Sequence, residues 1–160
     1  MPVQPFPAGK AAFRRYPTGV ALISAAGPDG PVGLTASSVA SVSLAPPALS
    51  FSVSKSRSAR AILEASSFVV HLLGSKHARL ARHFSRPDGP RFTPEQGWST
   101  LPSGEPILRG AVAALRGRPL HLVRVGDATL IVAEVIEVFH GPDSGRLVYH
   151  DRNFVTSPGQ

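Results

Sequence analysis

The chain has 160 residues, of which 42% are hydrophobic, and this predicts a single domain with a core of its own. It contains no cysteine, so disulfides, iron–sulfur clusters, thiolate zinc sites and cysteine nucleophiles are excluded. The 17 Lys and Arg residues against 10 Asp and Glu give a net charge of +7, which favours an anionic partner.

Predicted structure begins with an extended N-terminal arm over residues 1–12, because this stretch is rich in proline, and a helical turn at 13–16. A hairpin follows around the turn Gly27-Pro28-Asp29-Gly30. Two helices are expected, one from an N-cap at Ser56 to near Ser66 and one from a cap at Ser75 through Phe84. Strands are predicted where apolar and β-branched residues dominate, at 20–26, 32–36, 39–44, 48–54, 68–73, 111–115, 120–125, 130–139 and 146–149.

Many short antiparallel strands with interposed helices favour a mainly β fold, a β-barrel with helical insertions. Residues 86–106 form a long segment rich in Pro, Gly and Ser, which is typical of a lid or a partner-facing loop. The start of strand 130–139 is apolar on both faces, which favours a homodimer. No apolar run is as long as a membrane span and no signal-peptide pattern is present, so we expect a cytoplasmic protein without a membrane partner.

The most informative motif is the run Gly33-Leu34-Thr35-Ala36-Ser37-Ser38, which is followed about twenty residues later by Lys55-Ser56-Arg57-Ser58. The strand-like run 50–54 between them alternates serine with apolar residues. Hydroxyls and backbone N–H groups at such bends, together with a Lys and an Arg, suit a phosphate ester. The alternative is a Ser-rich barrel corner without a ligand.

Other site chemistries find no support in the sequence. His71, His77 and His83 are six apart and do not share a helical face, and no zinc-binding His motif occurs, so no metal site is expected. A Gly-x-Ser-x-Gly nucleophile motif, a Walker A motif and a dinucleotide-binding glycine motif at a strand-to-helix turn are all absent. A pocket rich in hydroxyls and cations without a catalytic constellation favours a cofactor that carries its own reactivity.

Nucleic acid is the other anionic partner to consider. The basic residues never form a run of five, and with one Trp and two Tyr the chain has few aromatic side chains for base stacking. We therefore expect no nucleic-acid partner and keep a basic nucleic-acid-binding barrel only as an alternative.

A family resemblance rests on several short motifs that occur in order along nearly the whole chain. They are 13–20 (FRRYPTGV), Asp29-Gly30, 33–38 (GLTASS), 41–47 (SVSLAPP), 68–73 (FVVHLL), 80–84 (LARHF), Gly126-Asp127 and 145–150 (GRLVYH). The set resembles the short-chain NAD(P)H:flavin oxidoreductases, the flavin reductases that accompany two-component flavin-dependent monooxygenases. The ordered set is specific, whereas each motif alone is weak.

The resemblance implies that residues 1–160 form one FMN-binding split β-barrel, Greek-key-like, with two or three short helices, usually as a homodimer. It implies hydride transfer from nicotinamide C4 to flavin N5 and delivery of reduced flavin to a partner monooxygenase. The flavin contacts that it implies are Pro17, Thr18, Thr35, Ala36, Ser37, Ser38, Ser54, Lys55, Ser56, Ser58, His83 and Phe84. Ser54, Lys55, Ser56 and Ser58 would hold the phosphate, with Arg57 adding charge. The nicotinamide side would comprise Asp127, Tyr149, His150 and Phe154.

Three positions depart from the family's common pattern. Ala128 follows Gly126-Asp127 where a His associated with nicotinamide binding is frequent, and His150 is the candidate to replace it. His71 stands for a common Asn and is expected to be structural, and Ala45 stands for a common Asp. Ala128 supports an alternative function, an FMN-binding carrier, sensor or complex subunit without efficient NAD(P)H turnover. NADH against NADPH, and FMN against FAD, stay open at the level of sequence.

Overall fold

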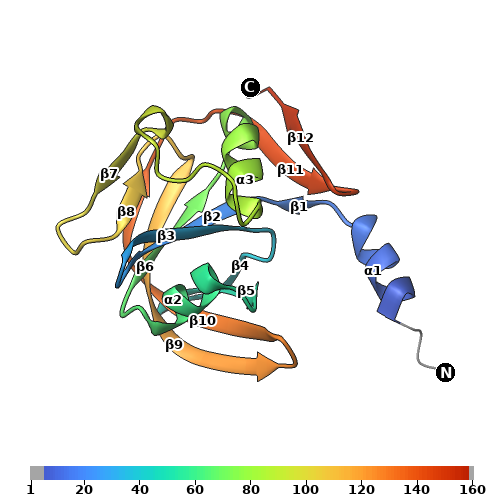
Figure 1. Cartoon of the computed structure of the whole chain (residues 1–160), viewed down its shortest axis with the longest axis horizontal. Helices are drawn as coiled ribbons and strands as arrows, with labels where there is room; N and C mark the ends of the chain where they lie inside the picture. Colours follow the sequence, from blue (N-terminus) through green and yellow to red (C-terminus); the bar gives the residue numbers. More distant parts are fainter. Residues whose placement is uncertain (1–5, 159–160) are drawn as a thin grey trace.

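A computed structural model describes residues 6–158 of the chain. The main sheet of this part consists of β2 (Ala21–Gly27), β3 (Gly30–Ala36), β4 (Ala40–Leu44), β5 (Pro47–Ser54), β6 (Phe68–Leu72), β9 (Ala113–Val125) and β10 (Ala128–His140). These strands pair antiparallel in the order β3-β2-β6-β9-β10-β5-β4. β9 and β10 form a long hairpin that extends beyond the rest of the sheet (Figure 1).

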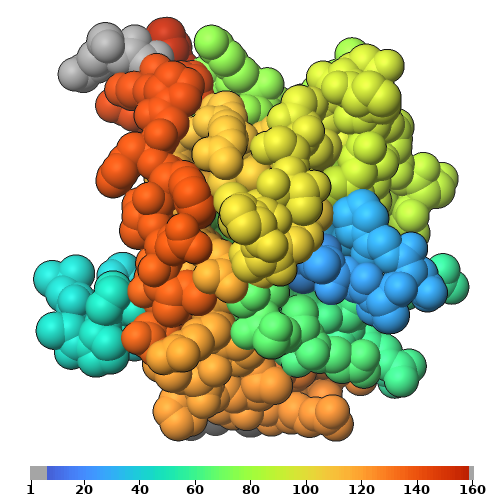
Figure 2. All heavy atoms as spheres, turned by 90° about the vertical axis from the view of Figure 1, so that its left-hand side faces the viewer, coloured from blue at the N-terminus to red at the C-terminus, as the bar shows by residue number. Residues whose placement is uncertain are grey.

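Two smaller sheets and the helices surround this main sheet. One joins β1 (Thr18–Gly19), β11 (Arg146–His150) and β12 (Asn153–Ser157), and the other joins β7 (Trp98–Thr100) and β8 (Pro106–Leu108). The α-helices are α1 (Phe6–Arg14), α2 (Arg57–Glu64) and α3 (Ala78–Ser85). Single 3-10 turns occur at Ser75–His77 and Pro94–Gln96. Figure 2 shows the segment with β7 and β8 on the outside of one face, beside the β2–β3 hairpin, and the β4–β5 turn projecting at the edge.

The core lies between the curled main sheet and the two helices that follow β5 and β6. Along β5, Phe51 and its apolar neighbours are buried while Ser52 and Ser54 are exposed, as the alternation predicts. The ring of Phe51 meets that of Phe68 edge to face, with centroids 5.3 Å apart. Ile62 places the apolar face of α2 in this cluster. A second cluster joins α3 to β2 and β11.

The main sheet curls without closing, because β3 and β4 are its two edges. In the connection from β3 to β4, the Ser38 hydroxyl accepts from the Ser52 backbone N–H at 2.9 Å and donates to the Ser52 carbonyl at 3.2 Å, which fixes this connection to β5. The predicted class, a mainly β split barrel with short helices, is confirmed. The motifs at 33–38 and 55–58, which predict a phosphate site, flank the opening left by the sheet.

Several local expectations were wrong. Residues 6–14 are helical and not part of an extended arm, since Pro7 lies in the first turn, where no N–H bond is required; residues 1–5 lie outside the described residues. Residues 113–115 of the first predicted stretch and all of 120–125 fall in one strand, β9, because Pro119 sits at a register shift opposite Ala133. Ser75 does not cap α3; it begins a 3-10 turn, and its hydroxyl donates to the Ser144 carbonyl.

No helix within residues 6–158 is long and apolar enough to span a membrane. The cytoplasmic location stays a prediction of the sequence.

Candidate functional site

A hollow of about 730 Å³ opens where the main sheet fails to close, and we call it the serine hollow. Its walls come from the end of β3, from the end of β5 with the start of α2, and from the segment after α3. The lining residues are Leu34, Thr35, Ala36, Ser37, Ser38, Ser52, Val53, Ser54, Lys55, Ser56, Arg57, Ser58, Phe84, Ser85, Pro87 and Arg91. The volume lies within the usual range of small-molecule sites.

The N-terminus of α2 supplies one wall of the serine hollow with hydrogen-bond donors. Ser56 is the N-cap, and its side chain accepts from the Ala59 N–H at 3.0 Å. The N–H groups of the first turn have no acceptor within the helix, and no acidic residue occupies that turn. Lys55 and Arg57 flank the cap and are exposed. This end of the helix therefore favours an anion, both through its dipole and through two nearby cations.

Arg91 ties the walls of the serine hollow together and was not singled out from the sequence. One guanidinium nitrogen, Nη1, donates to the Gly33 carbonyl at 2.6 Å and to the Ser58 hydroxyl at 3.0 Å. The other, Nη2, donates to the carbonyls of Phe84 at 3.2 Å and Arg86 at 2.7 Å. Its Nε is buried without a partner among the described residues. No sequence motif marks this role, because it depends on a loop returning to β3 and α2.

Close packing explains the glycine that opens the GLTASS motif. A Cβ at Gly33 would lie 2.8 Å from Cε1 of Phe84 and 3.2 Å from Cζ of Phe92. Those two rings meet edge to face at 5.1 Å. Thr35 also fixes β3 to α3, since its hydroxyl donates to the Ala81 carbonyl at 2.7 Å. The wall formed by β3 is thus held rigidly against α3.

A second hollow, of about 560 Å³, adjoins the first, and we call it the arginine hollow. Its lining comprises Val20, Thr35, Ser37, Arg82, Ser85, Arg86, Tyr149, Arg152, Asn153 and Phe154. The rings of Tyr149 and Phe154 pair across β11 and β12 at 5.2 Å. Thr35, Ser37 and Ser85 line both hollows, so the two spaces share a wall.

The predicted site residues fall into three groups. Nine of the predicted flavin contacts line the serine hollow: Thr35, Ala36, Ser37, Ser38, Ser54, Lys55, Ser56, Ser58 and Phe84. Two residues of the predicted nicotinamide side, Tyr149 and Phe154, line the arginine hollow. The remaining five line neither hollow: Pro17, Thr18, His83, Asp127 and His150.

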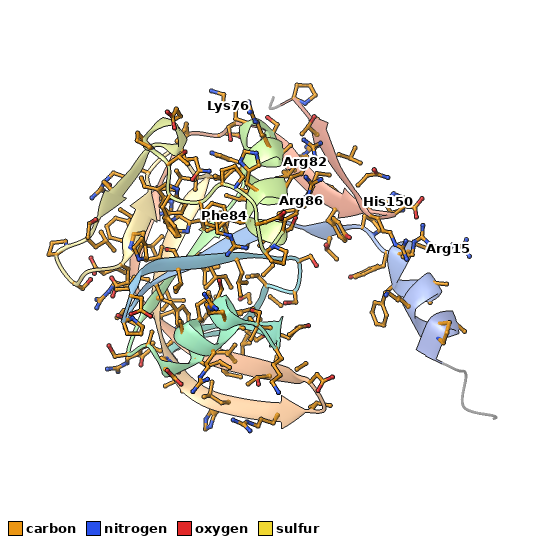
Figure 3. The ribbon with its side chains drawn as sticks, in the orientation of Figure 1. Arg15, Lys76, Arg82, Phe84, Arg86 and His150 are labelled. Carbon is orange, nitrogen blue, oxygen red and sulfur yellow. The ribbon has the colours of Figure 1, made fainter. Side chains whose placement is uncertain are left out.

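Each of these five has a local reason to lie elsewhere. Residues two apart on a helix point in roughly opposite directions, so His83 faces away from Ser85, which lines both hollows. Asp127 lies in the exposed β9–β10 turn and contributes only its carbonyl, which accepts from the Lys55 N–H at 3.1 Å. His150 is exposed at the end of β11, and Figure 3 shows it beside Arg15, away from α3. Pro17 and Thr18 belong to the approach to β1, where Thr18 is paired with Tyr149.

His71 is a structural residue. It is fully buried, and its Nδ1 lies 2.9 Å from the Leu22 carbonyl while its Nε2 accepts from the Leu108 N–H at 3.0 Å. Burial lowers the pKa of His71 to about 4, the bond to the Leu22 carbonyl opposing this shift. Within residues 6–158, no three His, Asp or Glu side chains are grouped closely enough to hold a metal ion.

The donor set fits a phosphorylated cofactor such as FMN. Serine hydroxyls, helix N–H groups and the Lys55 and Arg57 cations line the serine hollow, and the lining includes no carboxylate. The Nε of Arg91 is an additional buried donor without an acceptor in the described part of the chain. A phosphate ester at this place would therefore find partners without meeting a like charge.

Comparison with known proteins finds relatives that match most of the chain. Residues 13–158 match the model of the flavin reductase like domain. The NADH:FMN oxidoreductase of Rhodococcus qingshengii is 39% identical over 150 residues, which cover 91% of this chain and 78% of that protein. The reductase component of 4-hydroxyphenylacetate 3-monooxygenase of Pseudomonas aeruginosa is 30% identical over 140 residues, 84% of this chain and 82% of that protein.

A solved structure also resembles the chain closely. The crystal structure of a flavin reductase domain protein from Arthrobacter sp. FB24 superposes with a TM-score of 0.88 and 32% identity, over 96% of each chain. The family model covers the sheet and both hollows together. The chain therefore belongs to the flavin reductase like family.

Proposed function

We propose that the protein reduces FMN with a reduced nicotinamide dinucleotide and releases the reduced flavin to a flavin-dependent monooxygenase. The observation that carries the proposal is the serine hollow, in which two motifs about twenty residues apart line one space with hydroxyls and cations, beside a second hollow. The names of the Rhodococcus and Pseudomonas relatives support this reaction and this type of partner.

FMN would occupy the serine hollow, with its phosphate at the N-terminus of α2. Ser54, Ser56 and Ser58 would donate hydroxyl hydrogen bonds there, and Lys55 and Arg57 would neutralise charge. The ring would lie against Thr35–Ser38. Bound FMN would supply the hydride acceptor, N5 of its ring. The chain's own contribution is to hold two rings in contact and exclude water, which needs no side-chain acid or base.

We infer that FMN is the preferred flavin. The N-terminus of α2 and its flanking cations provide one phosphate site within the serine hollow, and the relative from Rhodococcus is named for FMN. FAD remains the alternative. A direct comparison of the dissociation constants of FMN and FAD, measured by quenching of flavin fluorescence, decides between them: we expect the lower constant for FMN, and a lower constant for FAD would contradict the inference.

A homodimer is proposed from the β9–β10 hairpin. Seven apolar side chains along its two strands are at least one third exposed on the single chain: Leu120, Leu122, Val123, Val125, Leu130, Ile136 and Val138. Several exposed apolar side chains on one element are typical of an interface between subunits. Light scattering during size-exclusion chromatography should give twice the chain mass, and Val125→Glu should shift it toward the monomer. A monomeric wild-type protein would contradict the proposal.

The experiment on the flavin site compares two lysines. Lys55→Ala removes a charge-assisted contact and should raise the FMN dissociation constant roughly tenfold or more. Lys76→Ala is the matched control, because Lys76 is exposed and lies well away from α2 (Figure 3). Unchanged FMN affinity in Lys55→Ala would count against the site.

The experiment on the reaction measures NADH and NADPH oxidation with added FMN. Turnover well above the rate of free flavin is expected. FMN binding without turnover by either donor would instead support the alternative of a flavin carrier or sensor, to which Ala128 points.

A further inference from the structure

Three arginines from two distant parts of the sequence line the arginine hollow. Arg82 comes from the last turn of α3, Arg86 is the C-cap of the same helix, and Arg152 comes from the turn between β11 and β12. Figure 3 shows Arg82 and Arg86 on the side of α3 that faces β11. Asn153 and the paired rings of Tyr149 and Phe154 complete this side of the hollow.

The charges of these three side chains are not neutralised by the protein. None of them has a carboxylate within salt-bridge distance in the described part of the chain, and no Asp or Glu lines the hollow. Arg82 instead lies over the ring of Phe154, 6.0 Å from its centroid. Like charges gathered in a concave site repel one another and raise the local concentration of anions. The hollow is therefore complementary to a ligand with several negative charges.

Arg152 adopts a backbone conformation that is unfavourable for arginine. Asp151 and Arg152 form a two-residue turn and both have positive φ angles, +49° and +63°. Gly, Asn and Asp suit such a turn, whereas Arg is unfavourable there. The turn is fixed from outside, since Asp151 accepts from Arg14 at 2.8 Å and its N–H donates to the Arg14 carbonyl at 2.9 Å. Strained residues of this kind are frequent at ligand sites.

We propose that the arginine hollow binds the adenosine phosphates of the hydride donor and selects NADPH over NADH through the 2′-phosphate. This inference rests on the proposed function, since it assigns the donor of that reaction. The pyrophosphate is common to both donors, so only the 2′-phosphate, with a charge of about −2, distinguishes them. Arginine matches phosphate with paired N–H donors. A carboxylate that could accept from the 2′-hydroxyl of NADH is absent from the lining.

The geometry agrees with this orientation of the donor. The wall shared by the two hollows, formed by Thr35, Ser37 and Ser85, would place the nicotinamide end next to the serine hollow. Tyr149 and Phe154 offer aromatic faces for a ring of the dinucleotide. The volume of about 560 Å³ is sufficient for part of a dinucleotide and within the range of ordinary ligand sites.

The test uses two adenosine ligands that differ only in the 2′-phosphate: adenosine 2′,5′-bisphosphate and adenosine 5′-monophosphate. Calorimetric titration of the full chain should show the bisphosphate binding roughly tenfold more tightly or better, and this preference should shrink as salt rises. Arg82→Gln, Arg86→Gln and Arg152→Asn should each reduce the preference. Arg152→Asn is the safest of the three for folding, because Asn tolerates the positive φ of the turn. Arg79→Gln is the matched control, an exposed arginine of α3 outside both hollows, and should keep the preference.

Kinetics provides a second measurement. The wild-type KM for NADPH should be lower than that for NADH, and the three variants should raise the NADPH KM more than the NADH KM while FMN affinity stays unchanged. Equal affinity for the two adenosine ligands in the wild type would overturn the inference, and so would an intact preference in a variant that carries all three substitutions. Neither of these results would contradict the proposed function. The proposed function would be contradicted by a different result, namely no FMN binding or no turnover with either donor.

Discussion

The Nε2 atom of His71 accepts a hydrogen bond of 3.0 Å from the backbone N–H of Leu108, and this contact fixes the protonation state of a buried ring. Because Nε2 is an acceptor, the proton of the neutral imidazole lies on Nδ1 and is donated to the Leu22 carbonyl at 2.9 Å. One side chain thereby connects β6 with β2 and β8. A second proton would break the bond to Leu108 and place an unpaired charge in the core.

The stability of the protein should therefore fall as the pH drops from about 6.5 to about 4. Burial lowers the pKa of His71 to about 4 in the folded chain, so the unfolded chain, with its ordinary value near 6.5, binds the proton first. The loss from this residue amounts to about 3 kcal/mol. Urea unfolding of the wild type and of His71→Asn at several pH values checks this. In His71→Asn the free energy of unfolding should depend much less on pH in this range. An equally steep dependence in the variant would show that His71 is not its cause.

Glu105 should contribute in a lower pH window. Burial alone raises the pKa of this carboxyl, but hydrogen bonds from Ser103 and Ser67 and the charge of Arg116 lower it on balance. Its stabilisation is present above the unfolded pKa and is lost as the pH falls through the folded one. Glu105→Gln should reduce the free energy of unfolding at pH 7 by about 2 to 3 kcal/mol.

A matched control for Glu105 is Glu137→Gln, which removes an exposed partner of the same Arg116. It should change the free energy of unfolding by less than about 1 kcal/mol. Urea unfolding measures the free energy of unfolding of both variants. Similar decreases in the two would contradict the expectation that the buried carboxylate stabilises the fold more than the exposed one.

Gly33→Ala should weaken FMN binding through the ring of Phe84. The new Cβ would lie 2.8 Å from Cε1 of that ring, which lines the serine hollow and cannot withdraw without disturbing Phe92. We expect a loss of stability of about 1 to 3 kcal/mol and a higher FMN dissociation constant. Gly19→Ala is the control, since nothing lies within 4 Å of its Cβ. Unchanged FMN affinity in Gly33→Ala would argue against a rigid wall at β3.

Arg91→Lys should lower both stability and FMN affinity although it keeps the charge. The guanidinium makes four hydrogen bonds with fixed geometry, to Gly33, Ser58, Phe84 and Arg86, and an ammonium group cannot reach all four. We expect the free energy of unfolding to fall by about 2 kcal/mol or more. Thermal unfolding and flavin fluorescence titration measure the two effects, with Arg79→Lys as the exposed control. Wild-type behaviour of Arg91→Lys would mean that charge alone matters at this position.

Much of the fold could be predicted because its signals are local. The alternation along β5, the N-cap at Ser56 and the glycine turns each act within a few residues. The predictions from sequence were wrong where the usual preference of a residue type did not decide the local structure. Pro7 suggested an extended arm, although the first turn of a helix tolerates proline, and β12 was missed because its turn uses Asp151 and Arg152 in place of glycine or asparagine.

The same contrast holds for the candidate site, where one hollow could be predicted from short motifs and the other largely could not. The serine hollow is built from two contiguous motifs, so the resemblance to a family was enough to nominate most of its lining. For the arginine hollow the resemblance gave only Tyr149 and Phe154 on the nicotinamide side. Its arginines could not be predicted, because Arg82 and Arg152 are seventy residues apart and share a space only after the C-terminal strands pack near α3. The excess of positive charge was the only sign of these arginines in the sequence.

The wall of Thr35, Ser37 and Ser85 has a kinetic consequence. Under the proposed assignment, the donor and the flavin would both contact these three side chains where the two hollows meet, so each would complete the surface that receives the other. Initial rates measured at several concentrations of both ligands should then give intersecting double-reciprocal lines, as for a ternary complex, and not the parallel lines of a reaction in which one product leaves before the second substrate enters.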